Sequence, residues 1–321
     1  MNKINVITLV NNNGMEVDIL NLGATVSSIK LPVNGELKEM TVTYENIEDF
    51  ASDPFYIGAT AGRYANRIAK GQFALNGQKY QLTTNNGGNC LHGGVEGFTH
   101  RLWQVESKDE TSVTLVLISP DGDQGFPGEL TTKVQYILSS ENELSIIFSA
   151  ESTKDTTINL CNHCYFHLGE DNIENLTLKI VSDAMLPVDE TSIPTGELRN
   201  IHGTDFDFNQ PVSLANRLPN LTDEMLDVTT GFDHCYTISG NIEEVVAELS
   251  SDTVKMSITT DQPGLQFYTA AYLSGVFKPF EGLCLEAQNY PDAINQSHFP
   301  SAVLKASDTY VKRVNYCFLT L

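Results

Sequence analysis

The residue with the clearest chemical potential is an acidic one inside an apolar run. The run Gly282–Pro291 has the composition of a buried β-strand, and Glu286 lies near its middle. Side chains alternate along a strand, so the core-facing side is formed by Leu283, Leu285 and Ala287. Partial desolvation raises the pKa of such a carboxyl group toward the range used in general acid–base catalysis. A structural ion pair would produce the same pattern, so other polar clusters must decide between the two interpretations.

A second polar cluster, Asn159–Leu168, has the pattern of a pocket wall. If the segment is a strand, one face carries the hydrogen-bonding residues Asn159, Cys161, His163, Tyr165 and His167. The opposite face is apolar except for Asn162. The spacing of Cys161 and Cys164 is that of some metal and redox sites, but on a strand the two thiols point to opposite faces. No second cysteine pair has matching spacing, so the sequence predicts no metal site.

Four further clusters supply other polar side chains: Gly62–Ile68, Asn89–Gly94, Gly231–His234 and Pro263–Tyr268. Each has an ordinary structural explanation by itself. An arginine in an acidic chain usually pairs on the surface, and a histidine before two glycines, such as His92, is often structural. Together the clusters supply an arginine, histidines, an aspartate, an amide and a buried glutamate. This set suits a site that holds a polyhydroxylated molecule while moving protons.

The elements that must position these residues are β-strands. Turn residues at Asn12–Gly14 and Asn76–Gly77 predict two hairpins. Strands are predicted at Ile4–Val10, Met15–Leu20, Gln72–Leu75, Gln78–Leu82, Val113–Ile118, Leu130–Leu138, Leu144–Ala150, Leu176–Val181, Val245–Leu249, Val254–Thr259 and Leu265–Leu273. Short helical turns are predicted at Leu214–Leu218 and near Glu48–Phe50. Without a repeat or a linker, the sequence predicts one all-β domain over residues 1–321, an antiparallel β-sandwich of many strands.

Composition limits the classes of partner. The 321 residues include 41 acidic and 19 basic ones, a net charge of −22, which repels nucleic acid and anionic membranes. The N-terminus lacks a signal-peptide core, and no stretch approaches the about 20 apolar residues that span a bilayer. The six cysteines lie mostly in apolar runs, as reduced thiols of a cytoplasmic protein do. A small-molecule partner is therefore expected.

Six motifs, in order along the chain, resemble those of the aldose 1-epimerases, or galactose mutarotases. They are Gly62–Ile68, Leu91–Gly94, Asn162–Phe166, Phe232–His234, Pro263–Tyr268 and Leu285–Asp292. Supporting matches extend from Leu22–Ala24 to Phe299–Ser301, so the resemblance covers nearly the whole chain. One such motif would be weak support for the family, whereas six in sequence are specific.

The resemblance implies a large antiparallel β-sandwich, also called a supersandwich, with a hexose bound in an open cleft. It implies interconversion of the α and β anomers of hexoses such as D-glucose and D-galactose, with neither cofactor nor metal. By motif, Glu286 resembles the family's general base and His163 its general acid. The positions that resemble substrate-binding residues are Asn66, Arg67, His92, Asp233 and Gln266.

The chain also departs from the family pattern. It has Ala270-Ala271 where the family often has Gly-Asn, and Cys161 where threonine is common. On the predicted strand Cys161 lies about 7 Å from His163. A thiol near an imidazolium has a lowered pKa, so one hypothesis is that Cys161 is sensitive to oxidation and alkylation. The alternative is that Cys161 fills space and is shielded from solvent.

The chemistry accounts for the residue types. Anomer interconversion removes the proton of the C1 hydroxyl and protonates the ring oxygen, so one base and one acid suffice. Other functions use overlapping residues. A cupin-like metal oxygenase would use His92, His163 and Glu286, and a glycosidase would need Asp233 and Glu286 as its carboxylate pair. A non-catalytic sugar-binding protein needs only the hydroxyl contacts, and an epimerase of phosphorylated sugars needs added basic residues.

Overall fold

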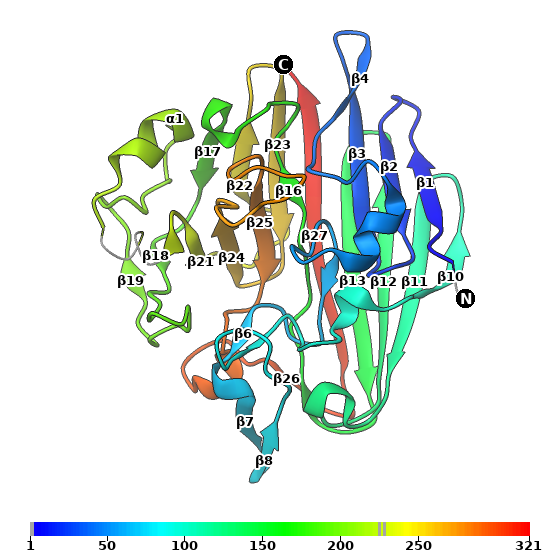
Figure 1. Ribbon diagram of the computed structural model, residues 1–321, viewed down its shortest axis with the longest axis vertical. Coiled ribbons are helices and arrows are strands. Elements are labelled where there is room, and N and C mark those ends of the chain that lie inside the picture. The colour runs from blue at the N-terminus through cyan, green and yellow to red at the C-terminus, as the bar shows by residue number, and fades with distance from the viewer. Residues whose placement is uncertain (1–2, 224–225, 227–228) are drawn as a thin grey trace.

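The computed structural model describes residues 3–223, 226 and 229–321. Met1 and Asn2, the first residues of the predicted domain, lie outside the described residues. The largest sheet has nine strands in the order β10 (Gln104–Lys108), β11 (Ser112–Ser119), β12 (Leu130–Leu138), β13 (Glu143–Ser152), β27 (Thr309–Thr320), β23 (Val254–Thr260), β22 (Val245–Ser250), β17 (Thr177–Ile180) and β20 (Val212–Ser213). Figure 1 shows the long strand β27, in red, between β13 and β23.

Smaller sheets complete the fold. A six-stranded sheet has the order β16 (Tyr165–Phe166), β25 (Leu283–Gln288), β24 (Gly264–Tyr268), β21 (Asp233–Thr237), β18 (Ala184–Met185) and β19 (Arg199–Asn200). A four-stranded sheet has the order β1 (Val6–Val10), β2 (Glu16–Leu20), β3 (Thr25–Val33) and β4 (Glu36–Glu39). Two-stranded pairs are β14 (Thr156–Thr157) with β26 (Val303–Leu304), β15 (Cys161–Asn162) with β5 (Thr60–Ala61), β6 (Arg67–Ile68) with β9 (Cys90–Leu91), and β7 (Gln72–Leu75) with β8 (Gln78–Gln81).

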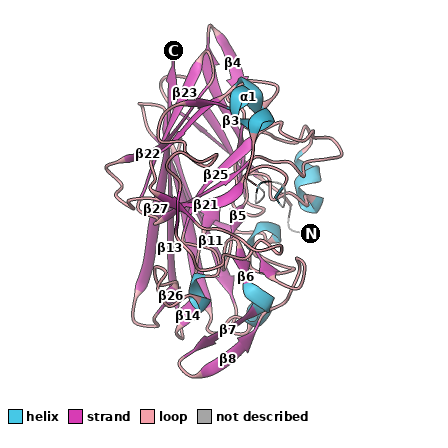
Figure 2. Ribbon diagram, turned by 90° about the vertical axis from the view of Figure 1, so that its left-hand side faces the viewer, coloured by secondary structure: helices cyan, strands magenta, loops and turns pink. Residues whose placement is uncertain are grey.

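Helical segments are short and connect strands. They include α1 (Leu214–Arg217) and the 3₁₀ turns at Ile47–Ser52, Ala69–Gly71, Phe98–His100, Asp123–Gly125, Ile173–Asn175, Leu218–Asn220 and Ala293–Asn295. In Figure 2 the long strands of the nine-stranded sheet lie to one side of β25 and β21, and α1 lies to the other. None of the helices in the described part of the chain is long and apolar enough to cross a membrane.

The main core lies under the sheets and follows from side-chain alternation. Every second residue of β12, from Leu130 to Leu138, is buried, and β13 has the same pattern. The largest cluster of buried apolar residues contains members from Ile7 to Phe318. The predicted all-β antiparallel sandwich is confirmed, because the strand pairs in these sheets run antiparallel. Strands β7 and β12 have the predicted bounds, and most other predicted strands differ by a few residues at their ends.

Two predicted strands are wrong in ways that affect the site. The segment Asn159–Leu168 is not one strand, because β15 ends at Asn162 and β16 starts at Tyr165. The Asn162 side-chain oxygen accepts the Cys164 backbone N–H, which stabilises the break. The strand predicted to run to Leu273 ends at Tyr268, since Ala270 has a φ of 58° that a strand does not allow.

Candidate active site

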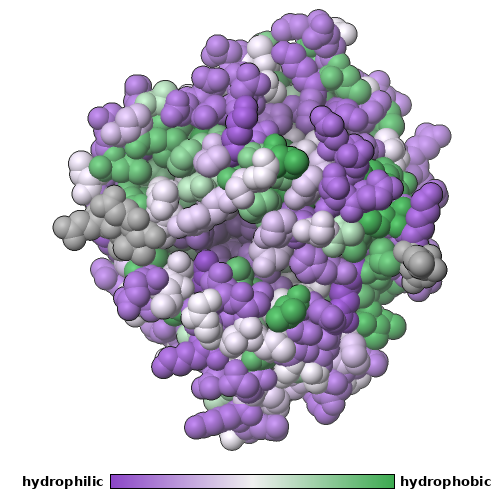
Figure 3. All heavy atoms as spheres, in the orientation of Figure 1, coloured by the Kyte–Doolittle hydropathy of each residue, from purple (hydrophilic) through white to green (hydrophobic). Residues whose placement is uncertain are grey.

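A cavity of about 590 Å³ lies beside the six-stranded sheet. Figure 3 shows this face of the molecule, which is hollowed near its centre. Six of the seven residues predicted for the site line the cavity: Asn66, Arg67, His92, His163, Asp233 and Glu286. Gln266 does not line it but hydrogen-bonds a residue that does. Segments more than 200 residues apart in sequence therefore meet here.

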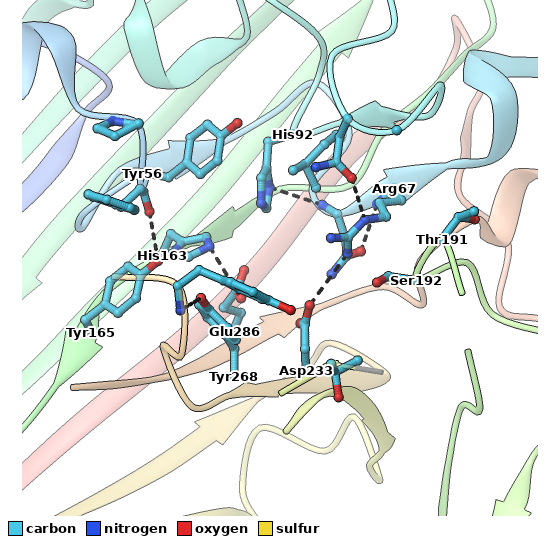
Figure 4. A pocket seen from close by; sticks show the side chains of 18 of the residues that line it. Tyr56, Arg67, His92, His163, Tyr165, Thr191, Ser192, Asp233, Tyr268 and Glu286 are labelled. Atoms are coloured by element: carbon cyan, nitrogen blue, oxygen red, sulfur yellow. Dashed lines mark hydrogen bonds and ion pairs between the residues drawn. The ribbon is translucent and has the colours of Figure 1, made fainter. Parts of the chain in front are cut away.

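The centre of the cavity is a pair of side chains that point toward each other (Figure 4). The distance between Glu286 Oε1 and His163 Nε2 is 3.6 Å, and the two side chains are 3% and 6% exposed. Glu286 lies within β25, whose apolar side packs into the main core. His163 lies at the break between β15 and β16. Since 3.6 Å is longer than a good hydrogen bond, each group remains available to a third molecule.

Burial sets the acidity of Glu286. Desolvation raises the pKa of the Glu286 carboxyl group above its ordinary value, because the charged form is disfavoured away from water. The positive charge of His163 and a hydrogen bond from Cys161 oppose that rise. A carboxylate of raised pKa is a stronger base, so Glu286 is suited to accepting a proton near neutral pH.

Two thiols flank the pair. The Cys161 thiol donates to Glu286 Oε2 over 3.3 Å, and Cys284 Sγ lies 3.6 Å from His163 Nδ1. The hypothesis of a reactive Cys161 thiolate is wrong. Burial and the neighbouring Glu286 carboxylate raise the pKa of Cys161 well above its ordinary value, and its side chain is inaccessible to solvent. The sequence pattern considered only His163 as a charged neighbour of this thiol, whereas the fold places the Glu286 carboxylate next to it.

The polar wall opposite is a connected network. Arg67 Nη1 lies 3.8 Å from Asp233 Oδ2, and Gln266 Nε2 donates to Asp233 Oδ1 over 2.6 Å. Arg67 Nε also donates to Asn86 Oδ1 over 3.1 Å. The register aligns Gln266 with Glu286 on adjacent strands, so the base and the network share one sheet face. Charged and amide groups that are fixed in this way can hydrogen-bond the hydroxyl groups of a ligand.

His92 is held as a neutral donor. The Asn66 backbone N–H donates to His92 Nδ1 over 3.2 Å, so the proton of the neutral ring resides on Nε2. Burial, and then the charges of His163 and Arg67, lower the pKa of His92 well below its ordinary value. Asn66 and His92 have φ values of 62° and 49°, which turn the backbone at this point. His92 therefore offers one N–H rather than a second acid.

The sequence predicted Tyr165 on a pocket wall, but not the aromatic wall that it forms with Tyr56 and Tyr268. Tyr56, Tyr165 and Tyr268 line the cavity, with the Tyr56 ring centroid 4.6 Å from that of His92 and 5.9 Å from that of His163. Tyr165 and Tyr268 lie inside motifs that the sequence singled out, which was the available signal. Aromatic rings of this kind form the apolar part of small-molecule sites. Figure 4 also shows Thr191 and Ser192 at the far side of the cavity.

Two residues from the polar clusters lie elsewhere. Arg63 is buried outside the cavity, where its guanidinium donates to the backbone oxygens of Ser119, Pro120, Pro127 and Gly128. Arg63 therefore links the two ends of the loop between Ser119 and Gly128. His167 lines a separate depression together with Lys38 and Glu281.

Metal ligation is poorly supported by the arrangement of donors. In the part of the chain that the structure describes, His163, Cys284 and Glu286 each offer one atom within 4.8 Å of the others. However, Cys284 approaches Nδ1 of the ring and Glu286 approaches Nε2, and these nitrogens lie on different edges. An ion bound to one nitrogen would leave the other contact unused. The alternative triad would also need a free ring nitrogen on His92. Nδ1 already accepts a backbone N–H, and Nε2 carries the proton of the neutral ring.

Comparison with known proteins gives consistent matches. A family model described as Aldose 1-epimerase matches residues 5–317. Galactose mutarotase of Bos taurus is 39% identical over 312 residues, covering 92% of this chain and 89% of that protein. Aldose 1-epimerase of Escherichia coli K12 is 34% identical over 329 residues, covering 98% and 94%. The crystal structure of galactose 1-epimerase from Lactobacillus acidophilus matches with a TM-score of 0.90 and 31% identity, covering 99% and 95% of the two chains.

Proposed function

Because this chain belongs to the aldose 1-epimerase family, it is an enzyme that interconverts the α and β anomers of aldoses, and we propose that Glu286 and His163 transfer the protons. The observation that carries this assignment is the buried pair, in which Glu286 Oε1 and His163 Nε2 are 3.6 Å apart in the cavity. A base and an acid so close can act on two oxygens bonded to one carbon. The C1 hydroxyl and the ring oxygen of an aldose are such a pair.

The proposed reaction begins with Glu286 as carboxylate and His163 as imidazolium. Glu286 takes the proton of the C1 hydroxyl while His163 gives a proton to the ring oxygen. The electron pair of the former O–H bond forms the carbonyl, and the bond from C1 to the ring oxygen breaks. The product is an open-chain aldehyde, with Glu286 protonated and His163 neutral. Rotation about C1–C2 presents the other carbonyl face, and the reverse transfers close the ring as the opposite anomer.

The polar network is proposed to hold the sugar through this rotation. Asn66, Arg67, His92 and Asp233 line the cavity together with the pair, Arg67 faces Asp233, and Gln266 supports Asp233 through a hydrogen bond. Contacts to hydroxyl groups remote from C1 would keep the open-chain sugar in place during rotation about C1–C2. D-Galactose and D-glucose are the proposed substrates.

The charge of the cavity distinguishes neutral from phosphorylated sugars. Among the described residues that line the cavity, Arg67 is the only arginine and there is no lysine. Asp233 already faces the Arg67 guanidinium. Glu190, Asp233 and Glu286 contribute negative charge. A phosphorylated hexose would therefore meet net repulsion, and neutral hexoses are favoured.

Organisation and location are also proposed from the described residues. Residues 1–321 are proposed to form one domain, since one apolar cluster draws on strands from both ends of the chain. The six cysteines are unpaired, as they are in a reducing compartment, so we place the enzyme in the cytoplasm. The net charge of −22 argues against nucleic acid as a partner.

The rate of anomer interconversion is expected to fall as the pH decreases. The midpoint of this fall, the acid limb of the rate profile, should lie above the ordinary glutamate pKa of about 4.3. Burial raises the pKa of Glu286, so its carboxylate is lost at a higher pH than that of an exposed glutamate. Polarimetry of freshly dissolved α-D-galactose and α-D-glucose, between about pH 4 and 8, measures the profile of kcat/KM. Saturable sugar binding without any acceleration would contradict the proposed function.

Removing either member of the ion pair in the network is expected to weaken sugar binding. Arg67→Ala and Asp233→Ala should each raise KM by about tenfold or more, since a charge-assisted hydrogen bond is lost. The turnover number should fall as well, because the same contacts orient the ring. Arg101→Ala is the matched control, since Arg101 pairs with Asp123 outside the cavity. Unchanged KM in both cavity variants would show that the sugar binds elsewhere.

A further inference from the structure

We propose that Cys161 is a positioning residue for Glu286, whose S–H fixes one carboxylate oxygen so that the other faces His163 and the sugar. The proposal rests on the proposed role of Glu286 as base. Its basis is a division of contacts: Cys161 Sγ donates to Oε2 over 3.3 Å, while Oε1 lies 3.6 Å from His163 Nε2. Oε2 therefore contacts the thiol, and Oε1 contacts the imidazole.

The glutamate needs such a partner. The last torsion of a glutamate side chain is broad, so rotation of the carboxylate is weakly restrained by the side chain itself. If the carboxylate rotated, its oxygen would meet the proton of the C1 hydroxyl at a poor angle. Misorientation of a reacting group reduces the rate strongly. A donor on Oε2 removes that freedom without using Oε1. Cys161 is placed to do so, because β15 pairs with β5 and brings the thiol next to β25.

The surroundings of Cys161 favour one orientation. Its side chain is completely buried and forms a small cluster with Ala61 and Ala65. Both alanines offer only methyl groups, whereas the Glu286 carboxylate offers an acceptor. Burial and the carboxylate raise the pKa of the thiol, so the sulfur keeps its proton and remains a donor.

A purely space-filling thiol makes a different prediction, and the chain contains one for comparison. Cys164 is also buried, but it belongs to the main apolar core. Replacing Cys164 removes a similar volume from a similar depth without touching Glu286. Cys164→Ala is therefore the matched control for Cys161→Ala.

The expected sign of the pH effect follows from the groups around Glu286. Those that interact with its charge are His163, Arg67, Asp233, Cys161, Cys235, Cys284, Tyr165 and Tyr316. In Cys161→Ala the others remain and one donor to the carboxylate is lost. The pKa of Glu286 then rises, and the acid limb of kcat/KM moves to higher pH. Serine restores a donor and should return the limb to the wild-type position or below it.

The experiment compares wild type, Cys161→Ala, Cys161→Ser and Cys164→Ala by polarimetry across the acid limb. Cys161→Ala is expected to lose about fivefold in kcat at the pH optimum with little change in KM, which corresponds to about 1 kcal/mol. The acid limb of Cys161→Ala should move to higher pH. Cys161→Ser should keep at least half of the wild-type kcat. Cys164→Ala should keep the wild-type profile even if its melting temperature falls.

Two outcomes would overturn the proposal. A folded Cys161→Ala with wild-type rate and acid limb would show that the thiol does not position the base. If that variant does not fold, an acid limb in Cys161→Ser that moves to higher pH would do the same. Activity retained by Glu286→Gln would instead refute the proposed function, so the two failures are distinguishable.

Discussion

Glu286→Gln is expected to lower kcat for anomer interconversion by at least about 100-fold, the lower range for loss of a general base. Glutamine preserves the shape of the side chain and can still accept from Cys161 through its carbonyl oxygen. It cannot take the proton of the C1 hydroxyl. The acid limb of the rate profile should also disappear, because the titrating group is gone. Polarimetry with α-D-galactose at high enzyme concentration measures the residual rate.

The matched control for this change is Glu281→Gln. Glu281 lies shortly before β25, and its carboxylate accepts the Lys278 backbone N–H away from the cavity. This variant should retain the wild-type rate and acid limb. A Glu286→Gln enzyme with near wild-type turnover, or with an unchanged acid limb, would remove Glu286 from the role of base.

Stability provides a check that Glu286→Gln acts on chemistry rather than on folding. Burial raises the pKa of Glu286 in the folded state above its unfolded value. The folded protein therefore disfavours the charged form, and above the unfolded pKa that charge costs stability. Glutamine removes this cost while keeping the volume. The melting temperature of the variant at neutral pH is expected to equal or exceed that of wild type, as for other strained functional groups.

The part of the site on β25 could be predicted because its signal is local. Leu283, Leu285 and Ala287 alternate with Glu286, and alternation on a strand requires no knowledge of the rest of the fold. Strands β7 and β12 were predictable for the same reason. The long strand β27 was missed, because its first half alternates between half-buried and exposed residues rather than apolar ones.

Contacts between distant elements could not be predicted from pattern alone. Cys161 meets Glu286 although β15 and β25 are not paired strands, and 125 residues separate the two positions. The break after Asn162 depends on the Asn162 side-chain oxygen accepting the backbone N–H of Cys164, which an alternation pattern does not reveal. The resemblance to a family supplied Arg67 and Asp233 as site residues. Their approach to 3.8 Å is a product of the fold.

His163→Asn is expected to lower kcat about as much as Glu286→Gln, again by at least about 100-fold. Asparagine keeps an N–H donor near the ring oxygen of the sugar, but an amide does not release its proton at neutral pH. The sugar contacts proposed for Arg67 and Asp233 remain, so KM should change by less than about threefold. Initial rates over a range of galactose concentrations separate the two constants.

The chain offers a matched histidine for this test. His167 is four residues later, and its Nδ1 accepts the Gly169 backbone N–H at a separate depression. An asparagine can accept the same N–H through its side-chain oxygen. His167→Asn should therefore keep wild-type turnover. If His163→Asn also kept it, another group would have to protonate the ring oxygen.

The double variant decides whether the acid and the base act in one step. If proton removal by Glu286 and proton donation by His163 belong to the same ring opening, losing either group already removes the concerted route. Glu286→Gln combined with His163→Asn should then be no slower than the worse single variant, as for other groups that act as a unit. Independent contributions would multiply to about 10⁴-fold instead. Because the two atoms lie 3.6 Å apart in one buried cavity, we expect the first result. A multiplicative loss would mean that the two residues serve separate steps.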